Sequence, residues 1–367
     1  MFNNYAQGLT MMTPSSAAAE KLRKDIHSGH YKIGQRLANE HELASTFGVN
    51  RGTIRKALKI LQEERLIARR QGHGTFVTNP TYAQPSGTAV SLLGAMSWEK
   101  EYYFGDILSE AFLRSISRGY MLTTTLNTTS DIESRNAEAL MKSGIQGLII
   151  SPKPHSIGTY RRFTEAGIPV VMLDSMLPNV DEDFVSVNDR MGAYMATRHL
   201  IELGHTRIGY VGNENFRNDF PCGPDRLEGF NIACMRHNIE VPQNWYVQSD
   251  SRVESDYLPK LRNLLGQLNR PTAIVAFGDS WAVRIVQIAR ELGLKVPRDL
   301  SVTGFDNSEL SRTNFIPLTT VSPEPDEVGK TIIDLLIERI ENPRPRPKRS
   351  ILITPRLVVR ESTAKPS

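Results

Sequence analysis

The sequence predicts an α/β protein with two folded parts, a short helix-turn-helix segment followed by a larger region of parallel strands and helices. Residues 36–77 place two short helical patterns on either side of the Phe47–Gly48 turn and end in a glycine-cornered hairpin. From residue 88 onward, short apolar runs alternate with amphipathic stretches. A chain of 367 residues is long enough for two or three compact units.

The two N-terminal helical patterns carry their own start signals. Asn39 is placed to cap the first helix, and Glu42, three residues later, completes a capping-box pattern. Asn50 can cap the second helix in the same way. The apolar residues of the second helix recur at the spacing of one helical face and predict a buried stripe, formed by Ile54, Ala57, Leu58 and Leu61.

The opposite face of the second helix is basic and polar. It presents Arg51, Thr53, Arg55, Lys56 and Lys59. A charged helix face is often no more than a solvated surface, but on the second helix after a glycine turn it is typical of DNA recognition. Arginine can hold guanine O6 and N7 together, whereas lysine mainly attracts phosphates. We therefore expect Arg51 and Arg55 to read bases, with Asn50, Thr53 and Lys56 beside them.

The hairpin after the second helix forms the expected wing. Its tip is Gln71-Gly72-His73-Gly74, where a backbone with few side chains can approach a phosphate or the minor groove. Gly72, His73 and Gly74 are therefore candidate DNA contacts. The alternative for either glycine alone is that it serves only the sharp turn.

This segment resembles the GntR family of bacterial regulators. The family's entry, its Glu-x-Glu-Leu-Ala first helix and its Arg-x-Thr-x-Arg-x-Ala-Leu second helix match residues 34–58, and its Gly-x-Gly-Thr-Phe-Val ending matches 72–77. Ala38 stands where the family usually has proline, and His41 where it often has arginine. The missing arginine leaves Arg36 as the expected third contact with DNA.

Charge is concentrated in the same part of the chain. Residues 15–80 contain twelve Lys or Arg and six Asp or Glu, a net charge of +6, while the whole chain carries +4. The remainder is therefore about −2 by difference. A basic small domain is the footprint of a nucleic-acid partner. We expect a winged helix-turn-helix DNA-binding domain over residues 15–78.

Other segments narrow the class of protein. The sequence has no apolar run near the ~20 residues of a membrane span. Residues 1–14 read as a flexible tail rather than a signal peptide, and residues 79–87 as a linker with two prolines. Cys222 and Cys234 have neither the spacing of a zinc site nor a disulfide framework. We expect a cytoplasmic protein without metal or cofactor.

The larger region, residues 88–363, has the pattern of parallel βα units. Helical stretches end in glycines that fit C-cap positions: Gly119, Gly144, Gly167, Gly204 and Gly293. The expected strands lie at 89–95, 120–126, 147–151, 168–173, 206–211, 272–277 and 300–305. So long a region favours two similar lobes with a ligand cleft between them.

The loops after the expected strands are rich in aromatic and charged side chains. Among them are Trp98, Tyr102, Lys153, Asp174, Asp279 and Asp306. A sugar needs this mixture, because charged groups hold adjacent hydroxyls and a flat ring covers the C–H face. Each aspartate can instead be a helix cap or part of a hinge salt bridge, and Asp279 directly precedes a helix. Trp98 and Tyr102 can equally be core aromatics.

The same region resembles the effector domain of LacI/GalR regulators, which is related to periplasmic sugar-binding proteins. The resemblance is carried by residues 199–212, 226–230, 296–310, 317–321 and 357–362. It implies two lobes joined by three crossovers near residues 188, 305 and 322. Lobe 1 would comprise about 88–187 and 306–322, and lobe 2 about 188–305 and 323–363.

The resemblance also implies ligand roles. Arg226 and Asp306 would hold ligand hydroxyls from opposite sides of the cleft, Asp174 would be a third polar contact, and Tyr257 the stacking aromatic. Gly278 departs from the family, which often has asparagine there.

A GntR-type reader joined to a LacI-type sensor resembles the arabinose-responsive repressor type. We therefore expect a homodimeric transcriptional regulator, a repressor more than an activator, that binds operator DNA and responds to a pentose or related sugar. A periplasmic binding protein would lack the reader. An aminotransferase-like fusion would need a Schiff-base lysine, and no such site or other catalytic set is visible. We expect no enzymatic activity.

Overall fold

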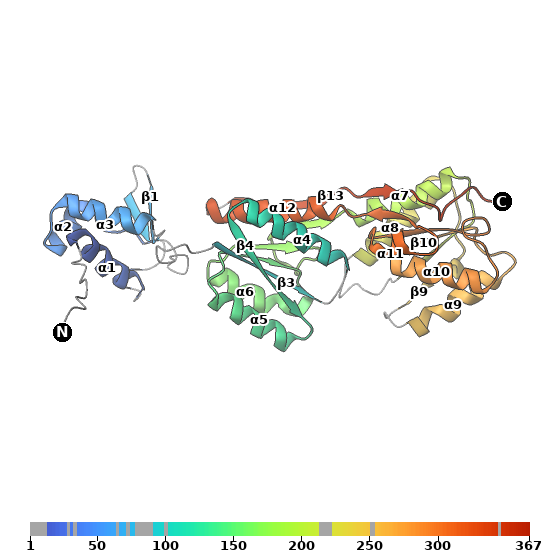
Figure 1. Cartoon of the computed structure of the whole chain (residues 1–367), viewed down its shortest axis with the longest axis horizontal. Helices are drawn as coiled ribbons and strands as arrows, with labels where there is room; N and C mark the ends of the chain where they lie inside the picture. The colour runs from blue at the N-terminus through green and yellow to red at the C-terminus, as the bar shows by residue number, and fades with distance from the viewer. Residues whose placement is uncertain are drawn as a thin grey trace, which may run out of the picture. The chain divides into compact units, whose positions relative to one another are not determined.

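The structure is a computed structural model. It describes residues 13–27, 30–31, 35–63, 66–70, 74–77, 91–98, 102–212, 222–249, 254–343 and 346–367. The chain divides into two compact units, Met1–Ser91 and Leu92–Ser367 (Figure 1). The expected linker at 79–87 lies outside the described residues, as does the expected tail up to residue 12.

The first unit is a winged helix-turn-helix. Its elements are α1 (Pro14–His27), α2 (Glu40–Phe47), α3 (Arg51–Glu63) and the antiparallel hairpin β1 (Ile67–Arg70) and β2 (Gly74–Val77). One apolar core joins α1, α2, α3 and the hairpin. The helix α1 was not among the sequence-based expectations; it buries Ala18, Ala19, Leu22 and Ile26.

The expected caps of the helix-turn-helix are present. The Asn39 side chain accepts hydrogen bonds from the backbone of α2, and the Glu42 carboxylate accepts one from the Asn39 backbone N–H, which completes the capping box. Gly48 ends α2 at φ 64°, in the left-handed region that favours glycine. The four residues of the apolar stripe on α3 are at most 2% exposed.

The second unit contains two six-stranded sheets. The first has the strand order β13-β7-β6-β5-β3-β4, and the second β14-β12-β11-β10-β8-β9. The first comprises β3 (Ser91–Trp98), β4 (Tyr120–Asn127), β5 (Gly147–Ile150), β6 (Val170–Leu173), β7 (Asp183–Val187) and β13 (Ser350–Ile353). The second comprises β8 (Ile208–Gly212), β9 (Tyr246–Gln248), β10 (Ala273–Ala276), β11 (Ser301–Phe305), β12 (Thr319–Ser322) and β14 (Arg356–Val358).

Helices cover both faces of each sheet. On the first sheet, α4 (Tyr102–Ser117) and α12 (Pro325–Glu341) share one apolar core, and Figure 1 shows α5 (Ser130–Lys142) and α6 (Ile157–Glu165) on the other face. On the second sheet, α7 (Asp189–Glu202) and α8 (Cys222–Arg236) pack on one face. The other face carries α9 (Glu254–Gly266) and α10 (Asp279–Glu291), and the short α11 (Glu309–Thr313) follows β11. We call the first sheet and its helices the first lobe, and the second sheet and its helices the second lobe.

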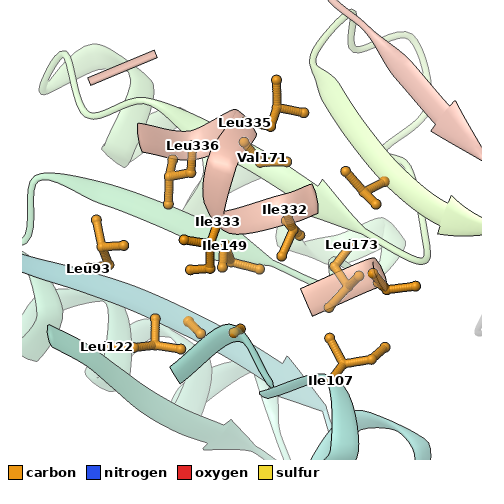
Figure 2. Packing of buried hydrophobic residues seen from close by; sticks show 14 of the residues in the cluster. Leu93, Ile107, Leu122, Ile149, Val171, Leu173, Ile332, Ile333, Leu335 and Leu336 are labelled. Carbon is orange, nitrogen blue, oxygen red and sulfur yellow. The ribbon is translucent and has the colours of Figure 1, made fainter. Parts of the chain in front are cut away.

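The lobe boundaries differ from the expected ones. The strand β12 pairs in parallel with β11, so residues 319–322 belong to the second lobe. The helix α12 packs its apolar stripe on the first sheet, where Figure 2 shows Ile332, Ile333 and Leu336 over Ile149 and Val171. The chain passes between the sheets near residue 188, after 322, and between 353 and 356. The expected crossover near residue 305 is therefore wrong, because β11 and the following β12 both belong to the second sheet.

The helix-ending glycines have the expected conformation. Gly119, Gly144, Gly167, Gly204 and Gly293 all have positive φ. Within the described residues, no helix is both long and apolar enough to cross a lipid bilayer.

Candidate DNA-recognition surface and effector site

The polar face of α3 is exposed in the first unit. Arg51, Arg55 and Lys56 are exposed, while Thr53 is half-buried. The side-chain oxygen of Asn50 accepts hydrogen bonds from the Thr53 backbone N–H at 2.8 Å and from the Thr53 hydroxyl at 3.1 Å. Asn50 therefore caps α3, and Thr53 reinforces that cap.

Arg55 is oriented by a residue of the preceding helix. Its Nη2 lies 3.0 Å from Oε2 of Glu40, and its Nε lies 3.3 Å from the same oxygen. The hydrogen bond to Glu40 and the charge of Glu40 raise the pKa of Arg55. The arginine side chain remains 64% exposed, so the pair is solvent-screened and orients Arg55 more than it stabilises the fold.

Arg36 and Gly74 meet on the wing, where Gly74 is the first residue of β2. Arg36 forms an isolated antiparallel bridge with Phe76 of β2. Gly74 has φ 111°, and a Cβ there would lie 2.6 Å from Nε of Arg36. Gly74 therefore has two roles: it adopts the positive φ of the turn, and it leaves space for the Arg36 side chain. Gly72 and His73 lie outside the described residues.

In the second unit, Arg226 on α8 is the most constrained of the candidate ligand residues. Its Nε donates to Oδ1 of Asp189 at 2.6 Å, and its Nη1 donates to the carbonyl oxygen of Phe277 at 2.6 Å. The guanidinium carbon lies 3.6 Å from the centroid of the Phe305 ring. Burial lowers the pKa of Arg226, but the carboxylates of Asp189 and Asp306 outweigh this effect and hold it well above its ordinary value.

Asp306 lies beside Arg226 at the carboxyl end of β11. Its Oδ1 is 3.5 Å from Nη2 of Arg226, and its side chain is 30% exposed. Both residues belong to the second lobe, so the expectation that they face each other across the two lobes is wrong. The backbone of Asp306 has φ 101°, which turns the residue back toward α8.

Gly278 leaves the space that Asp306 uses. A Cβ at position 278 would lie 2.9 Å from Oδ2 of Asp306. The residue that departs from the family pattern therefore sits in contact with the candidate ligand carboxylate. A side chain there would displace Asp306.

Asp279 has a structural role in place of the expected ligand role. Its Oδ2 accepts hydrogen bonds from the backbone and hydroxyl of Ser308, and its Oδ1 accepts one from the Thr320 hydroxyl at 2.6 Å. Burial raises the pKa of Asp279 despite these hydrogen bonds. The carboxylate is 1% exposed and fastens the loop after β11 to α10 and β12.

Tyr257 is also part of the core. It is 4% exposed within the apolar cluster of the second lobe. Its ring stacks on that of Trp281 with centroids 4.2 Å apart. Trp281 therefore covers one face of the Tyr257 ring, and the role of Tyr257 as the stacking aromatic stays a prediction. Trp281 is half-buried and is the more accessible member of the pair.

The remaining candidates lie at the strand ends of the first lobe. Asp174 follows β6 with φ 65° and accepts a hydrogen bond from the Ser186 hydroxyl at 3.2 Å. The Ser175 hydroxyl donates to the carbonyl oxygen of Pro152 at 2.6 Å, which brings the loops of Lys153 and Asp174 together. Nothing is described for the side chains of Trp98 and Tyr102.

Sequence reasoning missed Asp189 as the partner of Arg226. The two residues are 37 positions apart, and α7 and α8 must approach closely to bring them together. Gly229 permits that approach, because a Cβ there would lie 2.1 Å from the carbonyl oxygen of Arg190. The only signal in the sequence was an aspartate and a glycine on neighbouring helices.

Comparison with known proteins gives the same division of the chain. Residues 14–77 match the model for bacterial regulatory proteins of the gntR family, and residues 197–363 match that for a periplasmic binding protein-like domain. The chain is similar to solved LacI-type regulators. These include one from a Rhodococcus species, with TM-score 0.64, 25% identity and coverage of 75% of this chain and 98% of that one. A transcriptional regulator CelR–cellobiose complex aligns with TM-score 0.65 and 20% identity, over 89% of this chain and 100% of the other.

Sequence relatives span nearly the whole chain. It is 33% identical over 360 residues to the arabinose metabolism transcriptional repressor of Halalkalibacterium halodurans, with 94% of each chain covered. It is 30% identical to the protein of the same name from Geobacillus stearothermophilus, with 92% of this chain and 94% of that protein covered. It is also 33% identical to the HTH-type transcriptional repressor PurR of Escherichia fergusonii, over 83% of this chain and 92% of that protein. The chain therefore belongs to the transcriptional repressors that join a GntR-type DNA-binding domain to a LacI-type, periplasmic-binding-protein-like domain.

Proposed function

We propose that the chain represses carbohydrate-utilisation genes and leaves its operator when a small sugar binds between the lobes, with a pentose such as arabinose as the first candidate. The observation that carries the proposal is the pairing of Arg226 with Asp306 at the ends of the second lobe's strands. A guanidinium edge beside a partly exposed carboxylate is a hydrogen-bonding surface for adjacent hydroxyls. Names of relatives support the choice of arabinose.

The first lobe supplies the opposite wall in this proposal. Its strand-end loops bring Lys153 and Asp174 together, and both lobes present these loops at the carboxyl ends of their parallel strands. Trp281 takes the place of Tyr257 as the candidate ring for the apolar face of a sugar, because it is half-buried rather than part of the sealed core.

For the DNA side, we propose that Arg51 and Arg55 contact base edges, with Lys56 and Arg36 on phosphates. The exposure of Arg51 and Lys56 and the orientation of Arg55 by Glu40 support this assignment. Asn50 and Thr53 contribute by holding the start of α3 in place. Gly74 contributes by leaving room for Arg36. Binding to chromosomal operators would place the protein in the cytoplasm.

We propose a homodimer, because a near-palindromic operator needs two recognition helices. The outer face of α4 exposes Phe112, Leu113 and Ile116, which are 41%, 59% and 52% exposed, and Met121 on the neighbouring β4 is 46% exposed. Such a cluster of large apolar side chains favours burial against a second copy. Leu113→Glu combined with Ile116→Glu should shift the sedimentation coefficient to that of a monomer. A dimer that persists would place the interface elsewhere.

The decisive experiment combines a sugar panel with operator binding. Free pentoses, hexoses and disaccharides are tested for a rise in melting temperature, since a ligand that binds the folded state raises its apparent stability. Any sugar that does so is then added to the complex of protein and operator. We expect L-arabinose to raise the melting temperature and lower operator affinity. If no sugar does either, the proposed effector class is wrong.

Variants connect that response to the site. Asp306→Asn should lose most of the response to sugar while leaving sugar-free operator binding within a few-fold of wild type. Arg226→Ala should do the same, but with a lower melting temperature, because it leaves the buried carboxylate of Asp189 uncompensated. Arg298→Ala is the matched control, because it removes an exposed ion pair with Asp299 from the same lobe. Full induction in Asp306→Asn would remove Asp306 from the sugar site.

A further inference from the structure

Two of the three nitrogens of the Arg226 guanidinium form hydrogen bonds within the second lobe. Nε is bonded to Asp189, Nη1 is bonded to the carbonyl of Phe277, and one face lies on the Phe305 ring. Nη2 is directed toward Asp306 at the longer distance of 3.5 Å. The direction in which Nη2 points is thus set by the groups that hold the other two nitrogens. Asp189 is the only charged one of these two groups.

Asp189 lies where the chain passes from the first lobe to the second. It is the first residue of α7, directly after Asn188. The backbone N–H of Asn188 donates to the carbonyl oxygen of Ile353 on β13, in the first lobe, at 2.9 Å. The Asn188 side chain caps α7 by accepting from the Met191 backbone N–H at 3.0 Å. A rotation of the lobes about this crossing segment would therefore act directly on the residue that holds Arg226.

The contact between Asp189 and Arg226 is buried and closely packed. The Asp189 side chain is 7% exposed and that of Arg226 is 10% exposed, so water cannot readily replace either partner. The backbone of α7 is pressed against α8 at Gly229, which prevents the two helices from moving closer. Arg226 can change its orientation only by breaking its bond to Asp189 or by moving together with the start of α7.

We propose that Asp189 is the positioning residue of the effector site. It orients Arg226 for the sugar and transmits the position of Arg226 to the segment that joins the lobes. This inference rests on the proposed function of Arg226 as a sugar contact. In this proposal, one carboxylate that does not itself contact the sugar couples sugar binding to rotation of the lobes.

A purely structural pair between α7 and α8 is the competing explanation, and the chain offers a matched control for it. Arg190 of α7 bonds Asp225 of α8 at 3.0 Å, and both side chains are about half exposed, at 50% and 47%. This pair joins the same two helices but does not hold Arg226. Asp225→Asn therefore removes one of the two ion pairs of Arg190 with α8, the other being with Glu228 at 2.8 Å, without releasing Arg226.

The binding test uses the full chain and L-arabinose, with the other free pentoses as additional probes. Asp189→Asn should weaken pentose binding by roughly tenfold or more, the range expected for one hydrogen bond between charged groups. At saturating pentose, its operator affinity should change less than that of wild type. Asp225→Asn should stay within about twofold of wild type in both measurements. Equal behaviour of the two variants would overturn the proposal.

A second measurement does not depend on the sugar. The Nε–Hε signal of Arg226 in a ¹⁵N–¹H spectrum of the sugar-free protein is identified by its loss in Arg226→Lys. Its exchange with water should be slow in wild type and Asp225→Asn, and fast in Asp189→Asn. If wild type binds no pentose, the proposed effector is wrong, while this signal still decides whether Asp189 holds Arg226 in place. Unchanged slow exchange in Asp189→Asn would overturn that role.

The melting temperature of each variant shows whether it is folded. If Asp189→Asn does not fold, Asp189→Ser takes its place, because the smaller side chain admits water beside Arg226. The expected losses of pentose affinity and of slow exchange are the same. A folded Asp189→Ser protein that retains both would overturn the proposal.

Discussion

At the scale of single residues, the polar side chains of this protein separate into those that hold the structure and those that remain accessible. Asp279 and Arg226 both follow or face strand ends, but their surroundings differ. The hydrogen bonds of Asp279 to Ser308 and Thr320 stay within its own lobe and its side chain is buried, whereas Arg226 keeps one edge beside a partly exposed partner. Burial and hydrogen bonding therefore indicate which polar side chain holds the structure and which remains accessible, and residue type alone does not.

The recognition helix gives a prediction about specificity. Arg51→Ala should cost about 1–3 kcal/mol on the cognate operator and little on random DNA, because it removes base contacts. Arg55→Ala should behave in the same way, and Glu40→Gln should show a smaller loss because it only releases Arg55. Lys59→Ala should weaken both DNAs alike. Fluorescence anisotropy at several salt concentrations measures all four. Equal losses on both DNAs for the arginine variants would contradict the assignment.

One buried and one half-buried histidine give a prediction about pH. The ring of His205 contacts the Thr272 and Ser301 hydroxyls and the carbonyl oxygen of Ala364, and His199 contacts Thr363. Burial lowers the pKa of both histidines below 6.5. The folded state therefore binds fewer protons than the unfolded state, so stability is full above pH 6.5 and falls as the pH drops below it.

Urea titrations between pH 8 and pH 5 measure this effect. Each histidine contributes a slope of at most about 1.4 kcal/mol per pH unit. His205→Asn should flatten the slope, because it removes the more deeply buried of the two rings. A His205→Asn slope equal to that of wild type would mean that His205 does not titrate differently on folding.

At the scale of elements, helix contacts decide where functional groups meet. The pair α7 and α8 carries Asp189 and Arg226, and the pair α4 and α12 closes the core of the first lobe. Asp334 of α12 strengthens the second pair by bonding Arg114 of α4 and Arg118, which directly follows α4. Each lobe is therefore stabilised by its own pair of contacting helices, α4 with α12 in the first lobe and α7 with α8 in the second.

The contact between α7 and α8 gives a prediction about packing. Gly229→Ala should destabilise the second unit by about 1–3 kcal/mol, because its Cβ would overlap the backbone of Arg190. It should also weaken sugar binding by displacing Arg226. Gly105→Ala in α4 meets nothing within 4 Å and should instead stabilise by about 0.5–1 kcal/mol. Chemical denaturation tests both variants. A Gly229→Ala protein as stable as wild type would show that the helices can separate without cost.

At the scale of the whole molecule, the chain consists of two units with different tasks. The basic first unit has its own core, and the second unit contains both sheets of the effector domain. Ligand and operator affinities must be coupled reciprocally if one chain links them. A change caused by ligand binding must therefore be transmitted through the second unit to the DNA-binding domain.

Fragments test this division. A fragment that ends near Pro85 should fold and bind an operator half-site weakly, because it keeps the reader but loses the proposed dimer contacts. Residues 88–367 should bind the effector and show no DNA affinity above background. Circular dichroism and anisotropy check folding and binding. Operator binding by the second fragment at the level of the full chain would contradict the charge partition.

The sequence by itself determined the local features of this protein. Capping residues, the apolar stripe of α3 and the five helix-ending glycines depend on neighbours within a few positions, so their pattern predicted them correctly. The family motifs correctly predicted the two domain types. Arg226 and Asp306 were expected on opposite sides of the cleft, whereas the structure places them side by side in the second lobe.

Only the tertiary structure decided which strands and side chains share a lobe. Residues 319–322, Thr-Thr-Val-Ser, carry little apolar pattern, and their place was settled by pairing with β11. The short strands β7, β9, β13 and β14 carry too little pattern to be predicted alone. Tyr257 and Trp281 have the same aromatic character in the sequence, and packing alone buried one more deeply than the other. Asp189 and Arg226, 37 positions apart, became partners because α7 and α8 approach at a glycine, and packing of this kind leaves no local signal in the sequence.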